Sequence, residues 1–526
     1  GGNYNTVVGD EAGTALTTGD SNVIVGMVAG DALTTASDNV AVGQGALTAD
    51  TLGSKTVAIG RQALTTQNFT SATDTYNTAV GYHAGFLVTT GISNTIIGAA
   101  AGDALTDADY NVALGYHALS SDTLGSRATA IGQGALFSQN FTTATDNYNT
   151  AVGYAAGVNV TTGTHNTLIG GLAGDAITTG SNNVAVGKSS LSTATTAYST
   201  VAIGVNAGDA ITTGAQNTLI GFDSGTTLTT GGDNTAVGDR SLKLATTGGN
   251  NVALGTVALE NLTTAGSNVA VGWGSLRDNT TGAENTAVGK GSLENNTTAS
   301  YNVAVGRDAL FTNTTGTENV AVGTAAMYYT TTGGYNTAVG KSALDANTTA
   351  DSNTAVGWKA MFSNTTGHSN TAVGESALRH NTTAENNVGV GFSALTSNTT
   401  GAQNTALGWY ALRATTTGSD NTGLGKRALD ANTTGASNVA VGANAGLAIT
   451  TADDNTIVGT DAMNTCTTGH SNTAIGKRAG RLLTTGDRNV FVGKEAGNAA
   501  TTSDENTFLG NLAGTAVTTG ADNTFV

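Results

Sequence analysis

The sequence predicts an all-β fold, a parallel β-solenoid with 17 residues per coil. The segment Asn-Val-Ala-Val-Gly at 302–306 recurs with small changes at 285–289 and 319–323, and at similar intervals through the whole chain. A run of β-branched and small residues that ends in Gly indicates a short strand followed by a turn. Seventeen residues are too few for a strand and a crossover helix. We therefore expect about 30 stacked coils with one strand each.

We expect residues 1–526 to form one continuous solenoid, because each coil packs only on its neighbours. The spacing is strictly 17 residues in 217–526, whereas 1–216 includes two coils of 21 residues. Proline is absent, 74 residues are Gly and 11% are charged, which argues against a helix bundle. The chain starts without Met and stops within a motif, so we expect it to be a fragment of a longer chain.

The two long coils belong to a duplication of 72 residues, in which 39–110 and 111–182 are near copies. Each long coil carries an insertion of four residues with related text around Phe69 or Phe141. We expect two bulged loops in which these two aromatic side chains are buried.

Charge and composition exclude several functions. The formal net charge of −17 opposes binding to nucleic acid or to anionic lipid, and no segment is suited to direct membrane insertion. The single cysteine, Cys466, excludes an intrachain disulfide framework and has no recurring His or Asp partner, so we interpret it as structural. No acid, base or nucleophile trio repeats, so we expect neither an enzyme nor a cofactor nor a metal site.

Each coil is numbered here from its Asn as position one. Position five is Gly in every complete coil, which indicates a turn that needs positive φ or close backbone approach. The Asn side chains at positions one and twelve are expected to form hydrogen-bonded ladders between coils. The structural residues in the central coils are the turn glycines Gly289, Gly306, Gly323 and Gly340 and the ladder residues Asn285, Asn302, Asn319 and Asn336.

The one large side chain of each coil stands at either position nine or position twelve. Where position nine is Leu or Met, position twelve is usually polar or small, and where position nine is Gly, position twelve is aliphatic. Cores tolerate swaps that conserve volume. Two coils break this rule: Leu259 with Leu262 predicts local overfilling, and Gly497 with Ala500 predicts a small void.

The strand is apolar on both faces, since Ala304 points to one side and Val305 to the other. A narrow coil covers only one face, so another surface must cover the second. The simplest cover is a second copy of the chain, which predicts a homo-oligomeric fibre.

Aromatic residues at position six are the candidate ligand contacts. An aromatic ring there could stack on a sugar or pack between chains. The candidates are Trp273, Trp358, Trp409, Tyr82, Tyr116 and Tyr154.

The repeated Asn-Thr-Ala-Val-Gly and Asn-Val-Ala-Val-Gly strands, followed by x-x-Ala-Leu and Asn-Thr-Thr-Gly, resemble the head repeats of YadA-like trimeric autotransporter adhesins. They are more similar still to the 17-residue repeat arrays of bacterial and phage tail-fibre-type proteins. The resemblance covers the whole chain and implies a left-handed β-roll in an intertwined or side-packed homotrimeric fibre. It also implies an extracellular location on a cell surface or virion, and a host glycan or surface receptor as partner. The adhesin heads usually have a shorter period, and neck, stalk and anchor are missing here.

The function expected from this resemblance is attachment, as a cell-surface adhesin head or a phage tail-fibre shaft. The alternative is a self-assembling structural filament of an extracellular matrix or surface appendage that needs no receptor. An ice-binding solenoid is a minor alternative, because the paired threonines are adjacent and point to opposite faces rather than forming a flat doublet.

Overall fold

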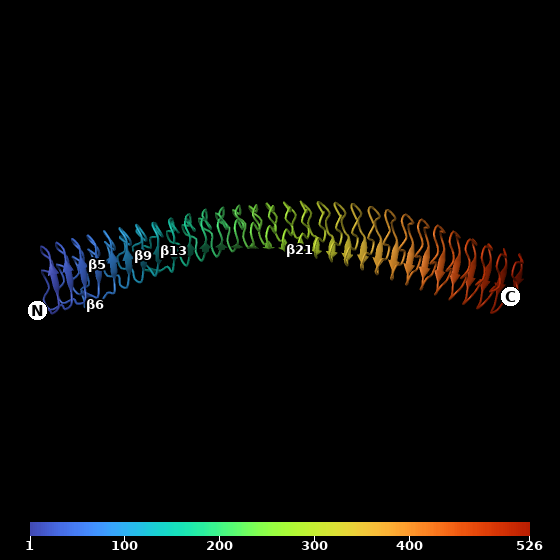
Figure 1. The fold of residues 1–526 in the computed structure, drawn as a ribbon, viewed down its shortest axis with the longest axis horizontal. Helices are drawn as coiled ribbons and strands as arrows, with labels where there is room; N and C mark the ends of the chain where they lie inside the picture. The colour runs from blue at the N-terminus through green and yellow to red at the C-terminus, as the bar shows by residue number, and fades with distance from the viewer. The chain divides into compact units, whose positions relative to one another are not determined.

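The computed structural model describes all residues from 1 to 526. The chain has strands and turns but no helix, so none that is long and apolar enough to cross a membrane. It divides into two compact units, residues 1–266 and 267–526. Figure 1 shows the strands of each unit as arrows that run side by side in successive coils. The predicted parallel β-solenoid with 17-residue spacing is confirmed, and 31 strands hold the equivalent place in successive coils.

The coil strands of the first unit are three residues long. They are β1 (Thr6–Val8), β2 (Val23–Val25), β3 (Val40–Val42), β5 (Val57–Ile59), β7 (Thr78–Val80), β8 (Thr95–Ile97), β9 (Val112–Leu114), β11 (Thr129–Ile131), β13 (Thr150–Val152), β14 (Thr167–Ile169), β15 (Val184–Val186), β16 (Val201–Ile203), β17 (Thr218–Ile220), β18 (Thr235–Val237) and β19 (Val252–Leu254).

The second unit continues the same pattern. Its strands are β20 (Val269–Val271), β21 (Thr286–Val288), β22 (Val303–Val305), β23 (Val320–Val322), β24 (Thr337–Val339), β25 (Thr354–Val356), β26 (Thr371–Val373), β27 (Val388–Val390), β28 (Thr405–Leu407), β29 (Thr422–Leu424), β30 (Val439–Val441), β31 (Thr456–Val458), β32 (Thr473–Ile475), β33 (Val490–Val492), β34 (Thr507–Leu509) and β35 (Thr524–Phe525).

Neighbouring strands pair in parallel with equivalent residues opposite each other, as Ala304 of β22 lies opposite Ala321 of β23. The turn glycine at position five permits the close approach of neighbouring coils. Gly306 has a φ of 133°, and a Cβ placed on it would lie 2.6 Å from the carbonyl oxygen of Gly323 in the next coil. A side chain would therefore meet both an unfavourable backbone conformation and a backbone atom that cannot move aside.

The Asn at position one ties three parts of the solenoid together. The backbone N–H of Asn302 donates to Oδ1 of Asn285 in the preceding coil at 3.0 Å. Its Nδ2 donates to the carbonyl oxygen of Gly316 at 2.9 Å, which closes its own coil. The ladder thus satisfies buried polar groups at one corner of the coils that have Asn at position one.

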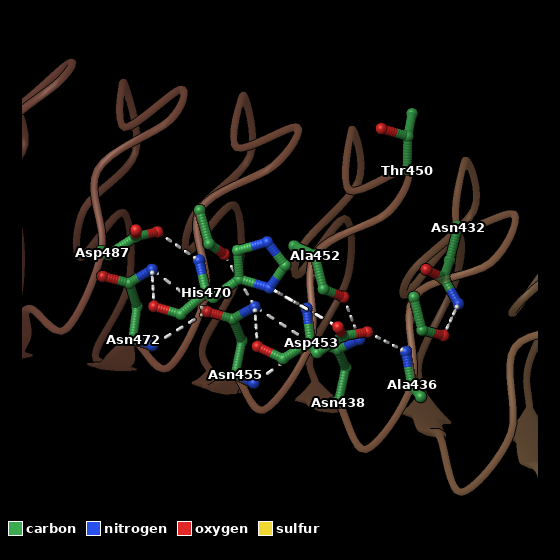
Figure 2. Close-up of polar contacts among 12 residues, drawn as sticks. Asn432, Ala436, Asn438, Thr450, Ala452, Asp453, Asn455, His470, Asn472 and Asp487 are labelled. Carbon is green, nitrogen blue, oxygen red and sulfur yellow. Dashed lines mark hydrogen bonds and ion pairs between the residues drawn. The ribbon is translucent and has the colours of Figure 1, made fainter.

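Another column is formed by side chains at position sixteen. Each accepts a hydrogen bond from the backbone N–H group at position sixteen of the preceding coil. The N–H of Ala436 donates to Oδ1 of Asp453 at 2.7 Å, that of Asp453 to Nδ1 of His470 at 2.9 Å, and that of His470 to Oδ1 of Asp487 at 2.7 Å. Figure 2 shows this column beside the ladder of Asn438, Asn455 and Asn472. Acidic residues before the motif therefore help to hold the coils in register.

The core of a coil is narrow and fully enclosed. Positions three, eight, nine and twelve supply it, and in the coil of β22 these are Ala304, Ala309, Leu310 and Asn313, all 0% exposed. Asn296 and its equivalents form the second ladder inside this core, because Nδ2 of Asn296 donates to Oδ1 of Asn279 at 2.9 Å. The Asn of each Asn-Thr-Thr triplet is therefore part of the packing.

The exchange between positions nine and twelve is confirmed, and the backbone explains it. Position nine has a left-handed conformation, with a φ of 50° at Leu310 and at Gly102. This conformation costs an L side chain roughly 1–2 kcal/mol and costs Gly nothing. Where Gly relieves the strain, the position-twelve side chain fills the space, as a Cβ on Gly102 would lie 2.9 Å from Cδ1 of Leu105.

The predicted void at Gly497 and Ala500 is wrong. Phe491, at position three of the same coil, is 0% exposed and fills the space, since a Cβ on Gly497 would lie 2.6 Å from its Cδ1. Position three is Ala in most coils. The exchange rule for positions nine and twelve therefore did not take into account a large side chain at position three. Leu259 and Leu262 are both 0% exposed, and the strain expected there stays a prediction.

The two insertions form the expected loops, and Phe69 and Phe141 are each 6% exposed. Each loop also adds a two-stranded parallel sheet. Beside the first loop β4 (Gly53–Ser54) of the preceding coil pairs with β6 (Thr73–Asp74), and beside the second β10 (Gly125–Ser126) of the preceding coil pairs with β12 (Thr145–Asp146).

A buried carboxylate organises each loop. Asp50 accepts hydrogen bonds from Nε2 of Gln67 at 2.7 Å and from the N–H groups of Gly53 and Phe69 at 3.0 and 3.1 Å. Burial raises the pKa of Asp50 despite these donors. Asp122 has the same environment in the second copy, and burial raises its pKa as well.

Candidate ligand-binding site

The six aromatic residues named from the sequence all lie at the surface, with 42–61% of each residue exposed. Each follows the turn glycine of its coil, so each ring stands at the same corner. Their surroundings differ and divide them into three groups.

A lysine covers each tryptophan. The Nζ atom of Lys290 lies 5.2 Å from the ring centroid of Trp273, and those of Lys359 and Lys426 lie 5.0 Å from the centroids of Trp358 and Trp409. These are cation–π distances, and the ammonium occupies a ring face that a sugar would need. The three tryptophans also lie in coils that are far apart in the sequence, so no two of them can form one binding site.

Tyr82 is engaged by its neighbours. Its ring stacks on His83 with centroids 3.9 Å apart, and His83 stacks in turn on Phe86 at 4.7 Å. The Arg61 guanidinium lies 5.8 Å from the Tyr82 centroid. His83 and Arg61 therefore cover much of the two faces of the Tyr82 ring.

Tyr116 and Tyr154 are brought together. They line one cavity of about 210 Å³, at the corner that follows β9, β11 and β13. The remaining lining residues are His117, Gln133, Gly134, Phe137, Ala155 and Val158. Tyr116, Gln133 and Tyr154 hold position six in three successive coils, so the two tyrosines are two coil spacings apart.

Gly134 lies at position seven of the middle coil, and a Cβ placed on it would have no atom within 4 Å. The His117 ring meets Tyr116 edge-on with centroids 4.1 Å apart, and meets Phe137 edge-on at 5.7 Å. The cavity thus has aromatic walls and open space above Gly134.

Hydrogen bonds to Ser120 and on to Asp103 fix the orientation of the His117 ring. Its Nδ1 lies 3.1 Å from Oγ of Ser120, and that hydroxyl donates to Oδ1 of Asp103 at 2.5 Å. The imidazole is therefore positioned before any ligand arrives.

Two of the eight lining residues, Tyr116 and Tyr154, were predicted from the sequence. His117, Gln133, Gly134 and Phe137 were not recognised, although a signal was available. Comparing the two copies of the 72-residue duplication shows that these four positions changed while the tyrosine at 82 and 154 was kept.

The structural residues form no part of this cavity. The turn glycines have φ values between 131° and 133°: Gly289, Gly306, Gly323 and Gly340. The ladder residues each donate a backbone N–H to the preceding Asn Oδ1 at 2.9–3.1 Å: Asn285, Asn302, Asn319 and Asn336.

No group of three or more His, Cys, Asp and Glu residues is placed to hold a metal ion. Cys466 is 0% exposed, and its Sγ lies 3.8 Å from the carbonyl oxygen of Gly469. Burial raises the pKa of this thiol to about 11, so it is protonated at neutral pH and a poor nucleophile.

No model of a known protein family matches the chain, and a search of curated proteins finds no match.

Proposed function

We propose that the chain is part of an extracellular attachment fibre, either a cell-surface adhesin head or a phage tail-fibre shaft, that contacts a host glycan or surface receptor. The observation that carries the proposal is the cavity between Tyr116 and Tyr154 on a scaffold whose coils are tied by repeated hydrogen-bond ladders. Binding residues held on regular coils lose little freedom when a ligand binds.

The fibre is proposed to contain three copies of the chain, each a left-handed β-roll. The outward side chain at position four is apolar yet partly exposed, as with Leu407 at 45% and Ile475 at 39%. A monomer seldom leaves such a long apolar row in water, because burying it is favourable. The likeness of the repeats to YadA-like heads and to tail-fibre arrays supports packing of these faces about a common axis.

A structural filament is the second candidate, favoured by the ladders that run through the coils of each unit. Ice binding is weaker. The position-thirteen hydroxyls are used between coils, as Thr314 Oγ1 donates to the carbonyl oxygen of Thr331 at 3.0 Å. Position fourteen leaves only a single file of exposed threonines, such as Thr315.

Binding of the purified full chain to a glycan array and to intact cells, with its assembly state measured by light scattering, tests the proposal. An attachment fibre predicts a discrete trimer that binds saturably. Open-ended polymers that bind neither glycans nor cells would contradict attachment and support the filament.

A further inference from the structure

The duplication supplies an internal comparison for the cavity at Gly134. The position 72 residues before each lining residue lies in the first copy, within the same kind of coil. Tyr154 corresponds to Tyr82, and the other lining residues have all changed. The correspondences that matter are Gly134 with Gln62, Ala155 with His83, His117 with Gly45 and Phe137 with Thr65.

In the first copy the space is closed. Oε1 of Gln62 lies 2.8 Å from Nε2 of His83, whose ring is stacked between Tyr82 and Phe86. Cγ of Gln62 lies 3.4 Å from the place of a Cβ on Gly45, so the glutamine covers that glycine. A hydrogen-bonded plug therefore fills the corner.

In the second copy both parts of the plug are gone. Gly134 and Ala155 replace Gln62 and His83, which leaves Tyr154 61% exposed. His117 and Phe137 stand where the first copy has Gly45 and Thr65, and they raise an aromatic wall beside Tyr116. Small residues form the floor and large ones the sides, which is the arrangement of a pocket.

The lining chemistry selects the ligand. No lining residue is Asp, Glu, Lys or Arg, and the chain as a whole carries a net charge of −17, so an anionic ligand is disfavoured. The Gln133 amide supplies a donor and an acceptor, and the Tyr116 and Tyr154 hydroxyls supply both as well. Tyrosine rings present π faces that attract the weakly positive C–H groups of a sugar ring.

The volume limits the size of the occupant. At about 210 Å³ the cavity is smaller than the roughly 300–1,000 Å³ of pockets that enclose drug-sized ligands. One six-membered ring is a suitable occupant, with the rest of a longer molecule outside. A phenyl side chain of a peptide would leave the amide and hydroxyl groups without partners, which favours a hydroxylated ring.

We propose that the cavity around Gly134 binds one neutral pyranose ring of a glycan, stacked between Tyr116 and Tyr154 and hydrogen-bonded to Gln133, while the first copy of the duplication is the closed form of the same site. This proposal deepens the attachment function and rests on it for its biological meaning. It makes the second copy, and not the tryptophans, the sugar-contacting element of this chain.

The test rebuilds the plug. The full chain is titrated with methyl glycosides of glucose, galactose, mannose and N-acetylglucosamine by ligand-observed NMR and calorimetry. Gly134→Gln with Ala155→His is expected to lower the affinity at least tenfold. The backbone accepts this change, because Gln62 already has a φ of 57° in the equivalent place, near the 67° of Gly134. Gln133→Ala is expected to weaken binding without closing the cavity.

The matched control is made in the first copy. Gln62→Gly with His83→Ala removes its plug and is expected to leave the affinity of the second-copy site unchanged. A glycan that binds the wild type and the plugged variant equally would overturn the cavity proposal and leave attachment standing. A tyrosine-containing peptide that binds the cavity where all four glycosides fail would also overturn it. Absence of binding to glycosides, array and cells alike would refute both proposals.

Discussion

Thr330 follows Asn313 in the buried column at position twelve and leaves Oδ1 of Asn313 without a hydrogen-bond donor. The hydroxyl of Thr330 also has no partner, and the residue is 0% exposed. Elsewhere in the column each Asn donates to the one before it, as Asn313 does to Asn296 at 3.0 Å. Thr415 interrupts the column in the same way and leaves Oδ1 of Asn398 unpaired.

Thr330→Asn is expected to repair the ladder. The new amide would donate to Oδ1 of Asn313 and accept from Nδ2 of Asn347. Because an unsatisfied buried polar group costs about 1–3 kcal/mol, the variant should be more stable by roughly 1–2 kcal/mol in denaturant titrations. Thr330→Val is the control, since it removes the unpaired hydroxyl but supplies no donor. A gain from Val equal to that from Asn would show that the ladder bond is not the cause.

Gly306→Ala is expected to destabilise the solenoid by about 2–5 kcal/mol. The added Cβ would lie 2.6 Å from the carbonyl oxygen of Gly323, and the φ of 133° is unfavourable for any L residue. Gly171→Ala is the matched control, because a Cβ there meets no atom within 4 Å. Thermal unfolding followed by circular dichroism compares the two. Equal melting temperatures for the two variants would contradict the close approach of the coils.

Asp345→Asn is expected to change the dependence of stability on pH. Burial raises the pKa of Asp345 to about 6, and nearby Lys359 only partly opposes this. Because the folded pKa lies above the unfolded value, the contribution of Asp345 to stability is fully present below about pH 4 and is lost as the pH rises through 6. The variant should therefore exceed wild type by on the order of 1 kcal/mol at pH 8, after allowance for solvent screening, and by little at pH 4.

The measurement is the free energy of unfolding of both proteins from pH 4 to pH 8. Asp420→Asn serves as the control, because Asp420 is exposed and its carboxylate makes no hydrogen bond or ion pair. A constant difference between wild type and Asp345→Asn across this range would refute the assignment.

Cys466 is expected to resist modification in the folded protein. Its thiol is buried and its pKa is about 11, so a thiol-specific reagent at pH 8 meets few accessible thiolates. Reaction should become complete and rapid only in denaturant. Rapid labelling of the native chain would contradict both the burial and the structural role.

The repeat made the architecture predictable from the sequence, because Asn302 and Gly306 act through the backbone of the neighbouring coil. Gly therefore recurs in every complete coil and Asn in all but the coils that begin at Thr56, Ala128 and Thr200. Phe491 was missed because its volume enters the core from position three, which is Ala in most coils. The cavity was only half predictable. Tyr116 and Tyr154 stand out by type, but Gly134 matters through a side chain that it lacks, and His117 and Phe137 become walls only once three coils are stacked.

Electron cryomicroscopy of the intact protein with a saturating methyl glycoside tests the trimer and the glycan cavity together. We predict three parallel chains that cover the apolar strand faces, with the cavity at Gly134 open to solvent and a single ring between Tyr116 and Tyr154. A lone chain, a filament without ends, or a cavity buried beneath a neighbouring chain would contradict it.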